Sequence, residues 1–175
     1  MSDVLNKEQV QFIDRRRLDA LSQQAALSPR LRQNYNFHRA DQEACHRLLN
    51  AMEPGSYIQP HCHRDEGKEE TLLVVRGRMG LVLFDEDGQV EGKALFEPAG
   101  DPLLVHIPRG TFHTWLSLQR GSVFFEAKAG PYRPLTKEEK APWAPAEGDP
   151  AVPEYLASLL KLFPPGDPEG RKALP

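Results

Sequence analysis

The sequence has few cysteines, no long apolar run and no excess of charge of one sign. Its 175 residues include two cysteines, Cys45 and Cys62, and begin with a polar stretch, so we expect reduced thiols, no secretory leader and a cytoplasmic protein. The longest apolar runs hold about five residues, far fewer than the roughly 20 that cross a bilayer. The formal net charge of −3 gives no general field for nucleic acid or an anionic membrane. We therefore expect neither partner.

Proline and glycine are the residues that the chain has in quantity. The 16 prolines and 13 glycines indicate many turns and few long helices, which favours a β-rich fold. A chain of this length has room for one domain with a sizeable core, but not for two comfortable ones. We expect a single domain.

Two histidines with one residue between them, His61 and His63, stand in the stretch 55–77. Successive side chains of a strand point to opposite faces, so in a strand both imidazoles would lie on one face. Glu70 opens the next apolar run, and an antiparallel partner strand could bring its carboxylate opposite the histidines. This pattern predicts three ligands of one metal ion.

A fourth ligand comes from residues 108–113, where Pro108 and Gly110 predict a turn into a β-rich run. His113 and Trp115 share a face of that run, so His113 can complete a set of three histidines and one carboxylate. Such donors suit iron, manganese, nickel, copper or zinc, and are too rich in nitrogen for calcium or magnesium. Glu69 remains an alternative to Glu70 as the carboxylate ligand.

These residues resemble the two motifs of the cupin superfamily. The first motif corresponds to residues 55–77, with six residues between Glu70 and Gly77, and the second to residues 108–113. The spacer between His63 and Glu70 is longer than usual, and Ser117 stands where an Asn is common. The resemblance implies a mainly β fold, a small barrel or jelly roll, with one bound divalent metal ion.

Other stretches resemble a narrower group, the WbuC-type cupin metalloproteins. The stretches are residues 28–32 with 36–38, 61–78, 125–132 and 141–148. The resemblance implies a link to bacterial surface polysaccharide (O-antigen) synthesis. It gives no substrate.

Two helices are expected outside the β region. The stretch 14–28 begins with Asp14, which suits an N-cap, and ends before Pro29, and the stretch 153–163 has leucines at helical spacing. We also expect strands at 44–51 and at 10–13, a loop held by Trp143, and a mobile tail from 164. The expected organisation is an N-terminal helix and arm (1–38), a cupin barrel (39–134) and a C-terminal loop, helix and tail (135–175).

Several basic and aromatic residues are candidates for binding an anionic, hydroxylated ligand such as a sugar phosphate, nucleotide sugar or carboxylated sugar. Arginine offers a planar donor fork to carboxylate or phosphate. Spacing alone, however, favours a solvated linker for residues 28–38, with Tyr35 and Phe37 buried and the arginines exposed. The candidates are Arg30, Arg32, Arg76, Lys128 and Tyr132.

Glu126 and Lys128 alternate in a buried strand, so they form either a pocket or a salt bridge. With Glu126 or His38 as proton carrier, the site could serve a metal-dependent isomerase, epimerase or lyase. His38 could instead be structural. An iron-dependent dioxygenase, a non-catalytic sugar-binding or regulatory module, and a histidine cluster that has lost its metal are the alternatives. A homodimer is compatible with exposed sheet edges.

Overall fold

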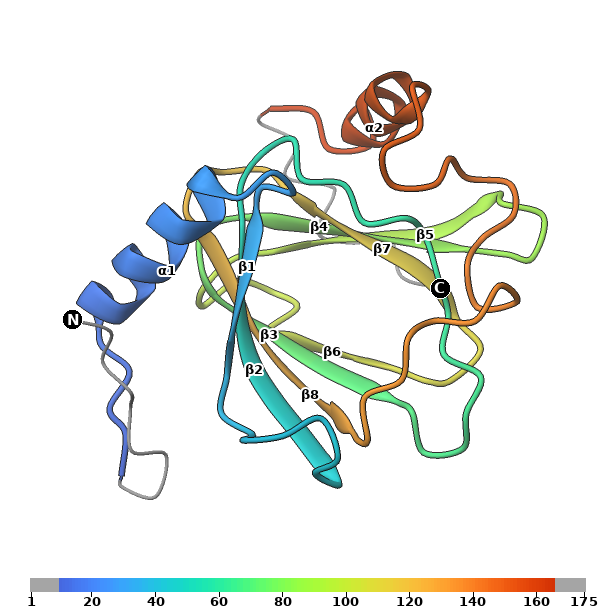
Figure 1. Cartoon of the computed structure of the whole chain (residues 1–175). Coiled ribbons are helices and arrows are strands. Elements are labelled where there is room, and N and C mark those ends of the chain that lie inside the picture. Colours follow the sequence, from blue (N-terminus) through green and yellow to red (C-terminus); the bar gives the residue numbers. More distant parts are fainter. Residues whose placement is uncertain (1–9, 166–175) are drawn as a thin grey trace.

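The computed structural model describes residues 10–165, which are mainly β with one helix near each end (Figure 1). The helices are α1 (Arg15–Leu27) and α2 (Val152–Leu160). The strands are β1 (Arg32–Asn36), β2 (Cys45–Met52), β3 (Glu70–Arg76), β4 (Met79–Phe84), β5 (Val90–Phe96), β6 (Leu104–Ile107), β7 (Phe112–Ser117) and β8 (Ser122–Ala129).

The strands form two antiparallel sheets that face each other. One sheet has the order β1-β2-β8-β3-β6 and the other the order β5-β4-β7. The two sheets are separate in the described chain, so the arrangement is a jelly roll rather than a closed barrel. The expected fold class, mainly β with a helix at each end, is confirmed.

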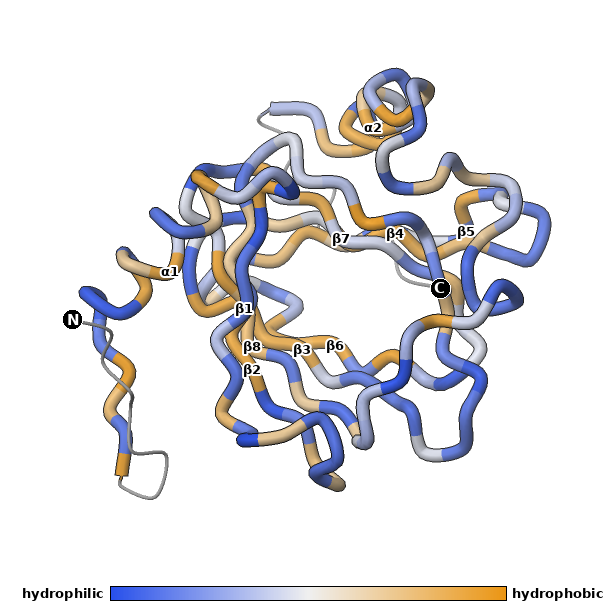
Figure 2. The backbone as a smooth tube through the Cα atoms, in the orientation of Figure 1, coloured by the Kyte–Doolittle hydropathy of each residue, from blue (hydrophilic) through white to orange (hydrophobic). Residues whose placement is uncertain are grey.

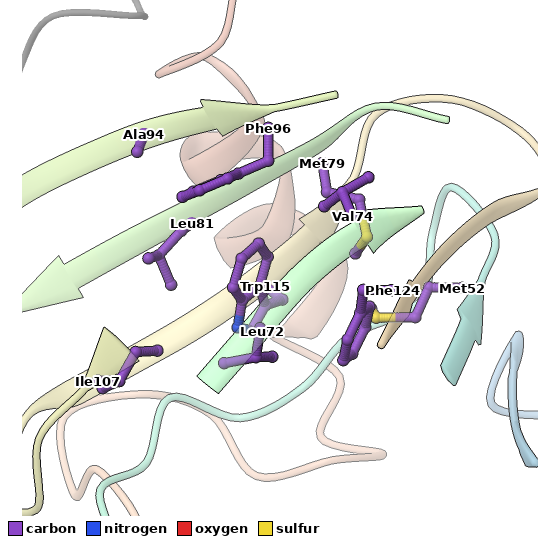
Figure 3. Close-up of a cluster of buried hydrophobic side chains, with 10 residues drawn as sticks. All are labelled: Met52, Leu72, Val74, Met79, Leu81, Ala94, Phe96, Ile107, Trp115 and Phe124. Atoms are coloured by element: carbon purple, nitrogen blue, oxygen red, sulfur yellow. The ribbon is translucent and has the colours of Figure 1, made fainter. Parts of the chain in front are cut away.

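The main core lies between the sheets. It brings together apolar side chains from both, including Leu72 of β3, Phe96 of β5, Trp115 of β7 and Phe124 of β8 (Figure 3). Figure 2 shows hydrophobic residues concentrated in the strands and hydrophilic ones in many of the connecting loops. Burial of this inner face fixes which side chains can line a cavity between the sheets.

Helix α1 packs on the outer face of the five-stranded sheet, beside β1 (Figure 1). Its N-cap is Asp14, whose carboxylate accepts the backbone N–H of Arg17 at 2.9 Å, as the sequence predicted. Leu21 and Ala25 are buried against the sheet and Leu18 is half-buried. The expected helix and its packing outside the sheet are confirmed.

Helix α2 covers the outer face of the three-stranded sheet. Leu156 and Leu159 pack against that sheet together with the loop that holds Trp143, and the Trp143 ring lies 4.8 Å from that of Phe84. No helix within residues 10–165 has the length and hydrophobicity to cross a membrane. Most of the tail expected from 164 lies outside the described residues.

Three expectations about secondary structure are wrong. Residues 32–36 are the edge strand β1 rather than a linker, because Arg32 to Asn36 pair in register with Met52 to Leu48. Residues 10–13 form no strand. His61 and His63 lie on an extended segment that makes only isolated bridges, at His61, and not on a full strand.

Candidate metal centre and adjoining cavity

The three histidines are brought together by a backbone bridge between segments far apart in the sequence. His61 N–H donates to the His113 carbonyl at 3.1 Å, and His113 N–H donates to the His61 carbonyl at 2.9 Å. The ring centroids of this pair are 4.7 Å apart, and that of His63 lies 5.2 Å from His61. A single reciprocal pair of hydrogen bonds therefore takes the place of the expected strand.

The turn that precedes β7 also contacts the histidine segment. Gly110 N–H donates to the His63 carbonyl at 2.7 Å, and Gly110 has a φ of +80°, which favours glycine. The two sequence motifs thus meet through backbone contacts at both His61 and His63. This explains why the turn and His113 stand at a fixed spacing.

Glu70, at the start of β3, lies against the histidines. His63 Nε2 is 2.9 Å from Glu70 Oε1, and His113 Nε2 is 3.2 Å from Glu70 Oε2. Glu69 is half-exposed and instead lies 3.5 Å from His106. The structure therefore brings Glu70, and not Glu69, to His61, His63 and His113.

Backbone carbonyls orient two of the imidazoles. His61 Nδ1 contacts the Gln59 carbonyl at 3.1 Å, and His113 Nδ1 contacts the Thr111 carbonyl at 2.9 Å. A carbonyl only accepts, so each Nδ1 carries a proton, and in the neutral imidazole Nε2 then keeps its lone pair. This second contact is the one that metal-binding histidines ordinarily make.

The ionisation of these groups follows from their burial and their neighbours. Burial lowers the pKa of His61 to about 3, and the nearby His113 adds to the effect, so His61 is neutral. Burial opposes ionisation of Glu70, but Lys128 and the histidines outweigh it and hold the pKa of that carboxyl well below its usual range. The set therefore offers neutral imidazole and anionic carboxylate.

Within residues 10–165, no three or more His, Cys, Asp and Glu side chains are arranged as a ready metal-binding group. Glu70 instead contacts two imidazoles directly. The chemistry of the donors nevertheless fits a transition metal ion. In addition, His113 Nε2 is buried and has no hydrogen-bond partner among the described residues, because its contact with Glu70 lacks the geometry of a hydrogen bond.

A cavity of about 390 Å³ adjoins these residues. It lies against the inner face of the five-stranded sheet, and His113 and Trp115 of β7 contribute to its lining. Its mouth carries exposed residues such as Arg30 and Tyr132, the latter 57% exposed. His61, Glu70 and His113 line the cavity, so a ligand in it could reach the candidate metal centre.

Lys128 joins two buried carboxylates in this cavity. Its Nζ lies 2.9 Å from Glu70 Oε1 and also contacts Glu126. Burial raises the pKa of Glu126, although Lys128 opposes the shift. Burial disfavours the charged form of Lys128, but the two carboxylates outweigh it and raise its pKa. Glu126 and Lys128 therefore form both a salt bridge and part of a pocket.

The candidate ligand-binding residues divide into two groups. Arg30, Lys128 and Tyr132 line the cavity. Arg32 is held elsewhere, because it donates to the Tyr57 carbonyl and pairs with Glu147 at 2.6 Å. The structure does not bring Arg32 to the cavity.

Arg76 also points away from the cavity. A shift in register between Val74 and Arg76 turns the end of β3 over, and Arg76 then donates to the Gly121 carbonyl and binds Asp19 of α1 at 2.6 Å. Regular alternation along β3 would place Arg76 on the same face as Leu72 and Val74, and this bulge breaks the alternation.

His38 lines the cavity as a member of a stacked pair. Its ring centroid lies 3.9 Å from that of His46, with 12° between the ring planes, and its Nδ1 contacts the Arg47 carbonyl at 3.2 Å. His46 Nε2 contacts the Asp41 carbonyl at 3.1 Å. The stack fixes both rings in the cavity wall.

The sequence interpretation missed several lining residues. Asn36, His46, Asn50 and Trp115 all contribute to the cavity, and the first two strands supply most of them. The available signal was the alternation along β1 and β2, since Asn34 and Asn36, like His46, Leu48 and Asn50, are two residues apart. Reading 28–38 as a linker concealed it.

Comparisons with known proteins give one partial family match and similar folds. Residues 13–96 match the model of a domain of unknown function (DUF6016). No curated protein matches the chain.

The solved structures include KdgF from Halomonas sp., with 19% identity, a TM-score of 0.45, and coverage of 74% of this chain and 94% of that one. CapF, a capsular polysaccharide assembling protein from Staphylococcus aureus, has 18% identity, a TM-score of 0.46 and coverage of 61% and 30%. A mutant of Bacillus subtilis oxalate decarboxylase OxdC has 20% identity, a TM-score of 0.42 and coverage of 56% and 24%. The chain thus spans about a quarter of OxdC. These scores are low, so the similarities carry no information on ligand or reaction.

Proposed function

We propose that this chain is a cupin-type protein that holds one divalent transition metal ion through His61, His63, Glu70 and His113. The metal would be iron, manganese, nickel or zinc. The protein would act on, or bind, a small anionic sugar-like ligand in the adjoining cavity. The role in O-antigen synthesis is part of the proposal and depends on the WbuC resemblance alone.

One observation carries the proposal more than any other. The half-buried imidazole of His61 and the buried imidazole of His113 each have Nδ1 on a backbone carbonyl, which in the neutral ring leaves the Nε2 lone pair for a metal ion. A cluster built only for packing has no need of this orientation. Metal binding uses all of it.

A metal ion at this position would polarise a carbonyl or hydroxyl oxygen of the ligand. The chain itself supplies the other functions. Glu126 lies within the cavity beside Lys128, and burial raises its pKa, so it is suited to take up or give a proton at its carboxylate oxygen. The apolar neighbours Leu48 and Leu72, opposite Glu126 on either side, restrict water around it.

These features favour a metal-dependent isomerase, epimerase or lyase. In such a reaction Glu126 would move the proton, and a metal ion held by the four ligands would supply polarisation of the oxygen next to the reacting carbon. Bound iron together with oxygen uptake would select the dioxygenase alternative. Unchanged ligand after long incubation would select the non-catalytic module.

The first experiment measures bound metal. The full chain, purified without a chelator or a metal-binding tag, is examined by elemental mass spectrometry beside a His61→Ala/His113→Ala double variant. We expect near one equivalent of metal per chain in the parent and a loss in the variant. His106→Ala is the matched control, because His106 is exposed and lies outside the cavity. A parent that neither carries nor takes up metal contradicts the proposal.

A second experiment separates catalysis from binding. Glu126→Gln keeps the size of the side chain but removes its ability to exchange a proton. If the protein is an enzyme, this variant retains metal and ligand binding and loses turnover by at least about a hundredfold. Equal conversion by parent and variant would remove Glu126 from the proposed role.

A further inference from the structure

The cavity contains a second set of polar groups, apart from the four proposed metal ligands, that lack partners within the described protein. Asn36 Oδ1, Asn50 Oδ1 and Trp115 Nε1 are buried and make no hydrogen bond. Asn50 is 8% exposed and Trp115 is 3% exposed. Because a buried polar group without a partner destabilises the fold, these atoms point to a ligand that supplies the missing bonds.

The three residues lie on one connected part of the wall. In the register of β1 and β2, Asn36 is opposite Leu48 and is thus a diagonal neighbour of Asn50. Asn50 is opposite Phe124 of β8, and the Phe124 ring stacks on Trp115 with 5.7 Å between centroids. Figure 3 shows the indole nitrogen of Trp115 near Leu72, another lining residue. One ligand can therefore reach all three groups.

The chemistry of these groups matches hydroxyls. An asparagine amide offers both an acceptor and a donor, and an indole N–H only donates. A hydroxyl group donates and accepts, so a ligand with several hydroxyls can satisfy the whole set. The floor beside them is apolar, with Leu48, Leu72 and Phe124, and this suits the C–H face of a sugar ring.

The size of the cavity limits the ligand. Its volume of about 390 Å³ is near the lower end of ordinary ligand sites. A single monosaccharide is of this scale. A nucleotide sugar would have to extend far beyond the mouth.

The charges of the inner cavity define the charge of the ligand. Among the lining residues, Lys128 and Arg30 contribute two positive charges and Glu70, Glu126 and Asp41 three negative ones, a formal sum of −1. A divalent ion on the candidate centre changes this sum to +1. The metal-loaded cavity then attracts a single anionic group, whereas the metal-free cavity repels it.

We propose that the cavity binds one monosaccharide-sized polyol that carries a single carboxylate. The hydroxyls of this ligand form hydrogen bonds with Asn36, Asn50 and Trp115. The inference deepens the proposed function and rests on it, because only bound metal gives the inner cavity a positive charge. The hydroxyl contacts themselves belong to residues outside the metal set. The two parts can therefore fail separately.

The test uses isothermal titration calorimetry on the full chain, loaded with Mn²⁺ or treated with a chelator, and metal content is measured on the same samples. The probes are the sodium salts of D-glucuronate, D-galacturonate and D-mannuronate, with D-glucose and cyclohexanecarboxylate for comparison. We expect at least one hexuronate to bind the loaded protein about tenfold or more tighter than glucose, which lacks the charge, or cyclohexanecarboxylate, which lacks the hydroxyls. Chelation should weaken the hexuronate at least as much.

Variants then test the hydroxyl contacts. Asn50→Leu keeps the branched shape of the side chain, Trp115→Phe keeps an aromatic ring, and both remove the polar atom, so each should weaken the hexuronate about tenfold and leave cyclohexanecarboxylate and metal content unchanged. Asn36→Leu, at the edge strand, gives the same test if either core variant does not fold. Gln33→Ala is the control, because Gln33 is exposed on β1 and does not line the cavity.

The outcomes separate metal binding from hexuronate binding. Absence of metal uptake contradicts the proposed function. If glucose still binds in that case, and if its binding depends on Asn50 and Trp115, only the hydroxyl contacts of the inference are supported. Metal uptake without binding of any hexuronate overturns the inference. So does hexuronate binding that none of the three polar-to-apolar variants weakens.

Discussion

Glu70 and Lys128 face each other directly across β3 and β8, and Lys128 Nζ lies 2.9 Å from Glu70 Oε1. From its own strand, Lys128 also contacts Glu126. Two buried carboxylates thus share one ammonium group at the wall of the cavity. The arrangement links the candidate metal centre to the proposed proton carrier.

Removal of this ammonium group should destabilise the protein strongly. Lys128→Met leaves two buried carboxylates without their cation, so we expect the free energy of unfolding to fall by about 3–5 kcal/mol. Urea unfolding of the metal-free protein measures it. The double variant Lys128→Met/Glu126→Gln should recover part of the loss, because one of the unpaired charges is gone. A loss below about 1 kcal/mol in the single variant would mean that the contacts contribute little.

Arg76 should matter for stability and not for ligand binding. It joins β3 to α1 through Asp19 and through the Leu18 carbonyl, and it also bonds the Gly121 carbonyl. Arg76→Ala should lower the free energy of unfolding by about 1–3 kcal/mol, since several bonds to a charged group are lost. Metal and hexuronate binding should be unchanged. Arg109→Ala, at an exposed position, is the control. If Arg76→Ala weakens ligand binding and leaves stability unaltered, Arg76 belongs to the ligand-binding site after all.

Gly77, the last residue of the first motif, should be required for packing rather than for metal. Its φ is +82°, and a Cβ there would lie 2.3 Å from Ser122 Oγ and 2.6 Å from Ser122 Cα. Gly77→Ala should therefore lower the free energy of unfolding by at least about 2 kcal/mol. Gly67 has a φ of +74° but open space around it, so Gly67→Ala should cost about 1 kcal/mol. Equal losses in thermal unfolding would refute the packing explanation.

Glu139 should make the free energy of unfolding depend on pH. Burial opposes its ionisation, but the backbone N–H groups of Arg64 and Thr136 donate to its carboxylate and lower the pKa of that carboxyl. The unfolded chain therefore binds a proton more readily. The stabilisation is present above the ordinary pKa of a glutamate and is lost as the pH falls through the lowered value.

The measurement compares urea unfolding of the parent and Glu139→Gln between pH 3 and pH 7. At pH 7 the variant should be less stable by about 1–3 kcal/mol, and the gap should close as the pH falls. Glu138→Gln is the matched control, since the Glu138 side chain is exposed. A gap that stays constant with pH would show that the loss comes from packing and not from ionisation.

Local patterns predicted much of the architecture. Asp14 and the apolar spacing that follows it predicted α1, because capping and helical periodicity act over a few residues. The turn before His113 and the run behind it predicted β7 for the same reason. The chain's two motifs also contained all four proposed metal ligands, since each motif places its donors at short range.

Long-range pairing decided the rest. The linker expected at 28–38 became β1 because Arg32 to Asn36 find partners on β2, and this pairing turned Asn36 into the cavity. A bulge in β3 turns Arg76 outward to α1, and an ion pair with Glu147 holds Arg32 outside the cavity. None of these outcomes is visible in local spacing, because each depends on which distant segment lies alongside.

The sequence by itself determined the donor types, the turns and the helix ends, because these depend on the chemistry and spacing of near neighbours. Only the tertiary structure decided that Glu70 rather than Glu69 meets the histidines and that Lys128 joins Glu70 to Glu126. It also decided that Asn50 and Trp115 come to one wall as buried groups without partners. The physical reason is that strand register and the packing of two sheets choose the neighbours of each inward side chain.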